Sequence, residues 1–371
     1  MTTNDLNSLT VILIFGSLIL LSFLKITNPL QVNKKANLLF GIFLLLWSTF
    51  WLDEISLLMG IKEIHLGFII FVRSIQFFAP IIFYYSTVFF TNPNYRFKTF
   101  DLFSLLLPFV FLTFLLLQRL YEKDNQYTFQ VVLTGIILAQ ALFYTTASFL
   151  RIRKHQKKIL LFTSNTEEID LSWLQYIIYL VWSISIIISI YNVLFPSVAP
   201  NLLINTSFLL VIFGIAYYSL KQKEIFPLDE KQRDAIISIE EEGQLTKMKR
   251  NILSDEDLIL LKSQLTNLMK EKKPYLDSEL NLLKLSELLK VTPHQLSYLI
   301  NTGFSENFFQ FINKYRVEKA KEILVKGEMN NFSILGIAYE SGFNSKTSFN
   351  TTFKKITGQT PSEFKKRCSG L

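Results

Sequence analysis

A run of fifty uncharged residues constrains the fold of this chain most strongly. Between Asp170 and Lys221 the sequence of 371 residues contains no Asp, Glu, Lys or Arg. A helix needs about 20 mostly apolar residues to cross a bilayer, so this run is long enough for two crossings. A short polar break, FPSVAPN at residues 195–201, divides the run. The pattern predicts two consecutive membrane-spanning helices.

Five further apolar stretches precede this run, so we predict seven spans. Hydrophobic residues make up 50% of the chain and charged residues only 18%, which is unlike an ordinary soluble domain. The predicted spans are Leu9–Leu24, Ala36–Leu58, Leu66–Phe90, Leu102–Leu117, Val131–Leu150, Leu174–Phe195 and Leu202–Leu220. Six or eight spans remain alternatives, because the first, second and fourth stretches are short or end in charges.

The basic residues of the predicted loops predict the orientation of the chain. Ten lie in the first, third and fifth connections, and three lie in the opposite connections. Basic residues accumulate on the cytoplasmic side, so we expect an external N-terminus and a cytoplasmic C-terminus. No basic residue precedes the first apolar stretch and no small-residue cleavage site follows it. We therefore expect a retained anchor rather than a signal peptide.

A few ionisable residues fall within the predicted spans, close to the outer face. They are Asp53 and Glu54 in the second span and Arg73 in the third. Charges at such positions are usually paired and often functional. One hypothesis is a pocket for a signal ligand that Trp47, Trp51 and Gln76 also line. The alternative is a structural ion pair or interfacial anchoring. Pro80 is expected to kink the third span or to free a backbone carbonyl.

The composition changes to a Lys- and Glu-rich pattern after Lys221. We predict a membrane sensor domain at residues 1–222, a cytoplasmic linker at 223–253 and a further domain at 254–371. The linker shows no sustained heptad, which favours a solvated tether over a dimerising segment. Fully extended, its thirty-odd residues would span about 100 Å.

Two helix-turn-helix patterns follow in the C-terminal domain. In the first, a short helix at Leu282–Leu289 precedes Thr292-Pro293-His294-Gln295, which has the residues of a capped helix start. In the second, Ile334–Glu340 precedes a helix from the cap Ser345 to about Ile356. Glycines at 342 and 358 are expected to end helices, and a capping box at residues 360–363 opens a last one.

The two patterns form an internal repeat separated by a long helix, about Glu306–Val325. Ser286 and Ala338 are the small residues where each helix pair crosses, and they lie 52 positions apart. A rigid spacer between two recognition helices would place them in successive major grooves, about 34 Å apart. From Lys290 onwards there are 12 basic and 6 acidic residues, which suits phosphate contact.

Three segments of the domain resemble the AraC/XylS family of transcriptional regulators. They are LSELLKVTPHQLSYLIN, FFQFINKYRVEKAKEIL and ILGIAYESGFNSKTSFNTTFKKITGQTPSEFKKR. The whole chain also resembles membrane-anchored bacterial regulators that join several spans to this domain. The resemblance implies an all-α, seven-helix transmembrane bundle with a cytoplasmic double helix-turn-helix domain. It also implies a location in the bacterial inner membrane.

The resemblance and the outward faces of the recognition helices together give a set of expected DNA contacts. The expected base-reading residues are His294, Gln295, Ser297, Tyr298, Lys346, Thr347, Ser348, Asn350 and Thr351. The expected phosphate contacts are Thr292, Asn301, Ser345, Lys354 and Lys355. Chemically, an Asn amide suits adenine, a Lys ammonium suits guanine, and Thr methyls suit thymine.

These patterns favour a one-component transcriptional regulator. Its expected partners are double-stranded promoter DNA, the lipid bilayer and an unidentified signal ligand, with RNA polymerase and a second copy of the chain as further options. A transporter or enzyme with a DNA-binding tail is the alternative. The three histidines, His65, His155 and His294, all lie outside the spans, and no phosphate-binding loop or nucleophile elbow is seen. We expect no catalytic residue, cofactor or metal. A bundle that only anchors the domain is a third hypothesis, although one span would suffice.

Overall fold

The computed structural model describes residues 2–61, 65–120, 126–167, 169–194, 201–221, 253–326 and 333–368. The predicted linker at 223–253 lies outside these residues, except for Leu253. The chain divides into two compact units, Met1–His155 with Leu171–Ile225, and Gln156–Asp170 with Phe226–Leu371. The described residues are mostly helical and contain no β-strand, only an isolated antiparallel bridge between Thr163 and Asn281. The all-α prediction is therefore confirmed for the described part of the chain.

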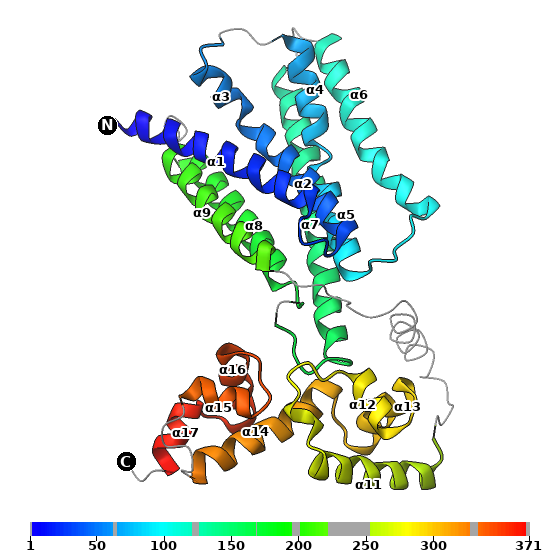
Figure 1. Cartoon of the computed structure of the whole chain (residues 1–371). Helices are drawn as coiled ribbons and strands as arrows, with labels where there is room; N and C mark the ends of the chain where they lie inside the picture. The colour runs from blue at the N-terminus through cyan, green and yellow to red at the C-terminus, as the bar shows by residue number, and fades with distance from the viewer. Residues whose placement is uncertain are drawn as a thin grey trace. The chain divides into compact units, whose positions relative to one another are not determined.

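The first unit is built from long apolar helices. In chain order these are α1 (Thr3–Thr27), α2 (Lys34–Ser48), α3 (Leu52–Leu58), α4 (Leu66–Gln76), α5 (Ala79–Thr91), α6 (Leu106–Leu120), α7 (Gln126–Ile159), α8 (Ser172–Leu194) and α9 (Asn201–Lys221). The last residues of α7 belong to the second unit. Helix α2 packs against α1 and α5, while α9 packs against α1 and α8 (Figure 1). The core of this unit includes Ile14, Leu18, Phe40 and Leu44, all fully buried.

The α1–α2 crossing depends on a glycine. A Cβ atom at Gly41 would lie 2.7 Å from Ile26 Cγ1 and 3.0 Å from the carbonyl oxygen of Ser22. The Ser22 hydroxyl donates a hydrogen bond to the Gly41 carbonyl at 2.8 Å. Small residues allow helix backbones to approach closely in this way, and hydroxyls can then bond between helices.

Six helical segments in the described residues are long and apolar enough to cross a membrane. They are Thr3–Thr27, Lys34–Leu58, Leu66–Thr91, Thr99–Leu117, Gly135–Ile159 and Leu202–Lys221. The remaining predicted span, Leu174–Phe195, coincides with the 23-residue helix α8, but Phe195 and several side chains of that helix lie outside the described residues. The number of spans therefore stays a prediction.

The third predicted span is interrupted next to Pro80. Helix α4 ends at Gln76 and α5 begins at Ala79, with Pro80 in its first turn. Proline has no N–H and is accommodated at a helix start, whereas inside a helix it removes a hydrogen bond. Close to the break, the Gln140 side chain donates to the Phe77 carbonyl at 3.0 Å. This bond joins the divided span to α7.

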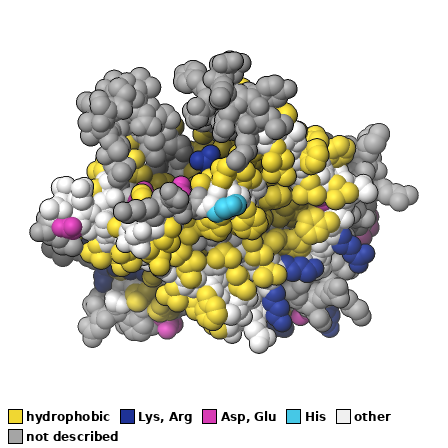
Figure 2. All heavy atoms as spheres, turned by 90° about the horizontal axis from the view of Figure 1, so that it is seen from above, with side chains coloured by type: hydrophobic (Ala, Val, Ile, Leu, Met, Phe, Trp, Pro, Cys, Tyr) yellow, Lys and Arg dark blue, Asp and Glu magenta, His cyan; other side chains and the backbone are white. Residues whose placement is uncertain are grey.

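The outside of the first unit is strongly apolar. Leu57, Phe100 and Leu203 are 72%, 76% and 68% exposed. In Figure 2, which views the molecule from above, hydrophobic side chains predominate over the described surface. Water disfavours such a surface, and soluble monomers rarely carry large continuous apolar patches.

The described residues of the second unit form seven α-helices. They are α11 (Asp255–Glu271), α12 (Leu282–Leu289), α13 (Pro293–Tyr298), α14 (Phe308–Lys326), α15 (Ile334–Glu340), α16 (Lys346–Thr357) and α17 (Pro361–Cys368). The short helix η3 (Pro274–Leu276) follows α11, and the π-helical turn η4 (Leu299–Gly303) follows α13. Helix α14 lies between the α12–α13 pair and the α15–α16 pair (Figure 1).

The long helix α14 supplies core residues to both halves of this unit. Towards its N-terminus Phe311 and Ile312 are buried, as are Leu285 and Leu296 of the first pair. Towards its C-terminus Val317 and Ala320 pack in one cluster with Phe349 and Phe353 of the second pair. Protein interiors are as densely packed as organic crystals, so a helix that is buried in two cores is held rigidly in both. Helix α14 therefore acts as a spacer of defined length between the two pairs. This position agrees with the spacer predicted at Glu306–Val325.

Candidate DNA-binding interface

In the first helix-turn-helix pair, α12 and α13, short-range hydrogen bonds cap the start of α13. Thr292 caps α13 by accepting a hydrogen bond from the Gln295 amide at 3.2 Å. The Gln295 side chain in turn accepts from the Thr292 amide at 3.0 Å. This is the predicted capping box, and it is confirmed. The predicted helix at 292–301 ends earlier as an α-helix, because the chain changes to the π-helical turn η4 after Tyr298.

The second pair, α15 and α16, has the same organisation. Ser333 caps α15 by accepting from the Gly336 amide at 3.1 Å, and Ser345 caps α16 by accepting from the Ser348 amide at 3.1 Å. Helix α16 ends at Gly358, whose φ is +77°. The cap predicted at Ser345 and the bounds predicted for α15 are therefore confirmed, and the bounds predicted for α12 agree with the structure as well.

The turns inside the two pairs differ chemically. In the first, Lys290 adopts a left-handed backbone conformation with a φ of +58°. In the second, Gly342 takes this role with a φ of +87°. Glycine carries no steric penalty there, whereas a residue with a Cβ does. Ser286 and Ala338 are 2% and 0% exposed, as expected of small residues at a helix crossing.

The second recognition helix α16 presents most of its predicted contacts to solvent. Lys346, Thr347 and Thr351 are exposed, as are the predicted phosphate contacts Lys354 and Lys355. Ser345, Ser348 and Asn350 are half-buried. The helix carries three lysines and no acidic residue. Such a face is suited to neutralising phosphates while short polar side chains approach base edges.

The first recognition helix α13 presents fewer of its predicted contacts. Thr292 and Asn301 are exposed, and His294, Gln295 and Tyr298 are half-buried. The side-chain oxygen Oε1 of Gln295 also accepts a hydrogen bond from the Thr292 hydroxyl at 3.1 Å, so this side chain is engaged in the helix cap. The helix has no charged residue.

The outward orientation expected for Ser297 is wrong. Its side chain is only 8% exposed, and the Asn301 amide donates to its hydroxyl at 3.5 Å. Ser297 directly follows the buried residue Leu296 on a helix of only six residues. On so short a helix, a residue next to the core side is easily covered by neighbouring elements. Asn350, the residue at the matching position of α16, is half-buried rather than buried.

Sequence reasoning missed Arg316, the largest fully buried side chain among the described residues. It lies on α14 within the apolar side, between Ile312 and Val317. Burial lowers the pKa of its guanidinium to about 10, while the charge of Asp277 opposes this effect, so Arg316 is charged at neutral pH. A basic residue within the helical spacing of an apolar stripe was the signal that could have revealed it, since a buried charge needs partners.

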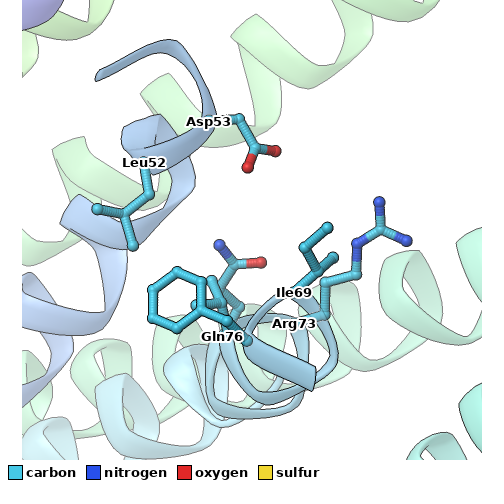
Figure 3. A pocket seen from close by; sticks show the side chains of 7 residues that line it. Leu52, Asp53, Ile69, Arg73 and Gln76 are labelled. Carbon is cyan, nitrogen blue, oxygen red and sulfur yellow. The ribbon is translucent and has the colours of Figure 1, made fainter. Parts of the chain in front are cut away.

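In the first unit, the structure brings two of the three predicted ligand residues to one pocket. Asp53 and Arg73 line it together with Gln76, and the remaining lining residues are Leu52, Phe68, Ile69 and Val72. Figure 3 shows Asp53 on one helix and Arg73, Ile69 and Gln76 on another. No ion pair joins Asp53 to Arg73 in the described part of the structure. Glu54, Trp47 and Trp51 do not line this pocket.

The two tryptophans take part in other packing. The Trp51 indole donates to the Asn205 side chain at 3.0 Å, and Asn205 donates to Asn7 at 2.9 Å. These bonds join α9 to α1 and to the short 3-10 helix Thr49–Trp51 that follows α2. Trp47 stacks on Phe43. No group of three or more His, Cys, Asp or Glu residues that could hold a metal occurs among the described residues.

Comparison with known proteins identifies the C-terminal region. Residues 285–367 match the family model for a helix-turn-helix domain. An HTH-type transcriptional regulator of Staphylococcus aureus is 36% identical over 88 residues, which are 24% of this chain and 11% of that protein. The transcriptional regulatory protein YesN of Bacillus subtilis is 34% identical over 86 residues, 23% of each chain. The chain thus spans a quarter or less of the length of these relatives.

Solved structures also match the C-terminal region. The C-terminal domain of the two-component response regulator yesN from Fusobacterium nucleatum is 31% identical. The match covers 28% of this chain and 96% of that one, with a TM-score of 0.25. From the family model and the curated relatives, the C-terminal region of this chain is an AraC-type helix-turn-helix domain, a DNA-binding domain found in transcriptional regulators.

Proposed function

We propose that this chain is a membrane-anchored one-component transcriptional regulator. One observation carries the proposal. Two helix-turn-helix pairs share the spacer α14, and the outer face of α16 carries Lys346, Lys354 and Lys355 without an acidic residue. A double motif of this kind suits two successive major grooves, and its lysines supply the sequence-independent part of the affinity. The predicted base readers of α13 and α16, Ser297 excepted, then select the site.

Six apolar helices and the exposed apolar exterior of the first unit support the membrane part of the proposal. Helices are the form in which a single segment satisfies its backbone hydrogen bonds inside a bilayer. We place the protein in the bacterial inner membrane with residues 254–371 in the cytoplasm, following the distribution of basic residues. The bundle would sense a signal, and the pocket between Asp53 and Arg73 is where we would look for the ligand.

The decisive experiment is genome-wide DNA occupancy of the tagged full-length protein. A double variant, Lys346→Ala with Asn350→Ala, is mapped beside it, because Lys346 is exposed, Asn350 is half-buried and neither belongs to the buried core of α16. Discrete sites that disappear in the variant would support sequence-specific binding from the membrane. Variant and wild-type maps that coincide would refute the assigned interface.

The membrane part has its own test. Cell fractionation with alkaline carbonate washing separates integral from peripheral proteins, and protease digestion of spheroplasts reports which end is external. We expect the chain to stay in the membrane fraction and its C-terminal tag to be protected. Release by carbonate, or digestion of the C-terminal tag, would overturn the proposed topology.

A further inference from the structure

The segment that connects α7 to α8 in sequence belongs structurally to the DNA-binding unit. In the sequence, residues 156–170 are a loop between two predicted spans. In the structure they form one compact unit with Phe226–Leu371. Ile159, Phe162 and Ser164 of this segment are only 1%, 6% and 1% exposed. A loop that merely joined two spans would have no reason to bury apolar side chains in this way.

Backbone hydrogen bonds hold the 156–170 segment at two helix starts of the domain. The Leu282 amide, in the first position of α12, donates to the Phe162 carbonyl at 2.9 Å. The Phe309 amide, in the first turn of α14, donates to the Leu160 carbonyl at 3.1 Å. The first four amides of any helix lack partners within the helix. The segment therefore supplies acceptors that these helices cannot supply themselves.

Ser164 completes the hydrogen bonding of the buried Arg316. The guanidinium makes five hydrogen bonds in all, and two go to Ser164, namely Nη2 to the hydroxyl at 2.9 Å and Nη1 to the carbonyl at 3.3 Å. The other three acceptors are the Tyr275 and Asp277 carbonyls and the Asn313 side chain. A guanidinium has five N–H donors, so loss of the segment would leave two donors of a buried cation unsatisfied.

The same serine contacts two further parts of the domain. Its hydroxyl donates to the Leu280 carbonyl at 2.6 Å, and its carbonyl accepts from the Asn313 amide at 3.1 Å. Leu280 lies just before the first helix-turn-helix pair, and Asn313 lies one turn before Arg316 on α14. Ser164 is thus hydrogen-bonded both to Leu280, which precedes the first pair, and to the spacer helix α14.

Arg316 also reaches the second helix-turn-helix pair. Its guanidinium lies 5.8 Å from the centre of the Phe343 ring, in the turn between α15 and α16. At Gly342 an added Cβ would approach Arg316 Nε to 3.2 Å and would clash with the Tyr275 carbonyl oxygen. One buried side chain therefore contacts the region before the first pair, the turn of the second pair and the 156–170 segment.

We propose that the 156–170 segment is the element through which the membrane bundle controls the DNA-binding unit, because its docking on Arg316 and Asn313 fixes the two helix-turn-helix pairs relative to each other. This inference rests on the proposed function. In the docked state both recognition helices are held at one spacing, which is the DNA-competent state. Since the segment continues directly into α7 and α8, a rearrangement of those helices would strain or release it and so shift a two-state equilibrium.

The test uses full-length protein in lipid nanodiscs and the variant Ser164→Ala. Thr166→Ala is the matched control, since its backbone carbonyl accepts from the Ile169 amide within the same segment and the substitution leaves that bond in place. Hydrogen–deuterium exchange is measured for peptides containing the Leu282 and Phe309 amides. Affinity is measured for DNA fragments occupied in the genome-wide experiment.

We expect Ser164→Ala to speed exchange at both amides and to weaken DNA binding by about tenfold, since a hydrogen bond from a buried charged donor is lost. Thr166→Ala should change neither quantity. Unchanged exchange in Ser164→Ala would overturn the docking, and faster exchange with unchanged DNA affinity would overturn the control role. If wild-type protein binds no DNA, the proposed function fails first, while the exchange result still decides whether the segment docks.

A second variant avoids any dependence on how well Ser164→Ala folds. Thr163 and Asn281 form an antiparallel bridge, and paired residues of this kind have Cα atoms about 4.5–5.5 Å apart, within the range of a disulfide. Thr163→Cys with Asn281→Cys is made in a Cys368→Ser background and oxidised in membranes. We expect efficient cross-linking, and DNA binding by the oxidised sample at least as tight as by its reduced form. Absence of the cross-link, or weaker binding when it is formed, would overturn the proposal.

Discussion

The two helix-turn-helix pairs share one architecture but differ in charge and in turn chemistry. Helix α13 has no charged residue, whereas α16 carries three lysines. The first turn uses Lys290 and the second uses Gly342 for the left-handed residue. Two copies of one fold can therefore contribute differently to DNA binding. We infer that the second pair supplies most of the phosphate attraction, while the first pair depends on a few partly buried polar groups.

The turn of the second pair should be the most sensitive position of the domain. Gly342→Ala places a Cβ against the Tyr275 carbonyl and imposes a residue with positive φ, so we expect a loss of about 3 kcal/mol or more in the stability of the unit. Lys290→Gly, the matched change in the first turn, should alter stability by no more than about 1 kcal/mol. Hydrogen exchange of α15 and α16 in the full-length protein measures the effect. Equal losses of stability in the two variants would contradict the proposed difference between the two turns.

Base recognition should also be unequal between the pairs. We expect Lys346→Ala with Asn350→Ala to weaken binding to an occupied site by at least tenfold, at about 1–3 kcal/mol for each base contact. His294→Ala with Tyr298→Ala should cost less than about tenfold, because both side chains are half-buried on an uncharged helix. Titration of labelled DNA with both variants at one salt concentration gives the ratio. A larger loss for the first pair would reverse our division of roles.

The salt dependence of binding should follow the second pair. Replacing Lys354 and Lys355 by Gln should lower the slope of log affinity against log salt by about 2, at about 0.9 for each phosphate contact. The choice of sites should be unchanged, because phosphates carry no sequence information. Asn301→Ala, at the position matching Lys354 in the repeat, removes an expected phosphate contact that carries no charge, so it should leave the slope unchanged and serves as the control. An unaltered slope in the lysine variant would show that other residues contact the phosphates.

The smallest effect concerns pH at two capping boxes. Backbone and side-chain hydrogen bonds with Thr360 lower the pKa of Glu363, so its contribution to α17 is present above the unfolded pKa and is lost as the pH falls through the folded one. The box that starts α13 uses the neutral Gln295 and should not respond. Hydrogen exchange of α17 and α13 between pH 6 and pH 3, corrected for intrinsic rates, tests this. Persistence of the α17 response in Glu363→Gln would assign it to another group.

Much of the DNA-binding unit could be predicted from the sequence because its decisive interactions are short-range. Thr292, Ser333 and Ser345 each bond an amide three residues further on, so the cap and the helix start are encoded in four consecutive residues. The bounds of α15 followed from such a signal, whereas those of α12 followed from the spacing of its leucines. The placement of Ser297 was wrong, because periodicity gives the direction of a helix face but not how far neighbouring elements cover it.

The membrane unit was predicted less completely. Length and hydropathy indicated the apolar helices, six of which are long enough to span a bilayer in the described residues. Sequence placed Asp53 and Arg73 at the same depth, and the structure puts both at one pocket. The separation of Trp51 from that pocket, and its bond to Asn205 of α9, depended on how distant helices pack. Their order around the bundle cannot be deduced from hydropathy.

The sequence alone determined most helices of the DNA-binding unit, several of their caps, the repeat and the basic character of the second pair, because each depends on residues a few positions apart. Only the tertiary structure decided that Ser164 meets Arg316 across 152 residues of sequence. A buried guanidinium needs acceptors for its N–H groups, but many carbonyl and hydroxyl oxygens of the chain could supply them. Which ones do so is settled by the simultaneous packing of α12, α14 and the 156–170 segment.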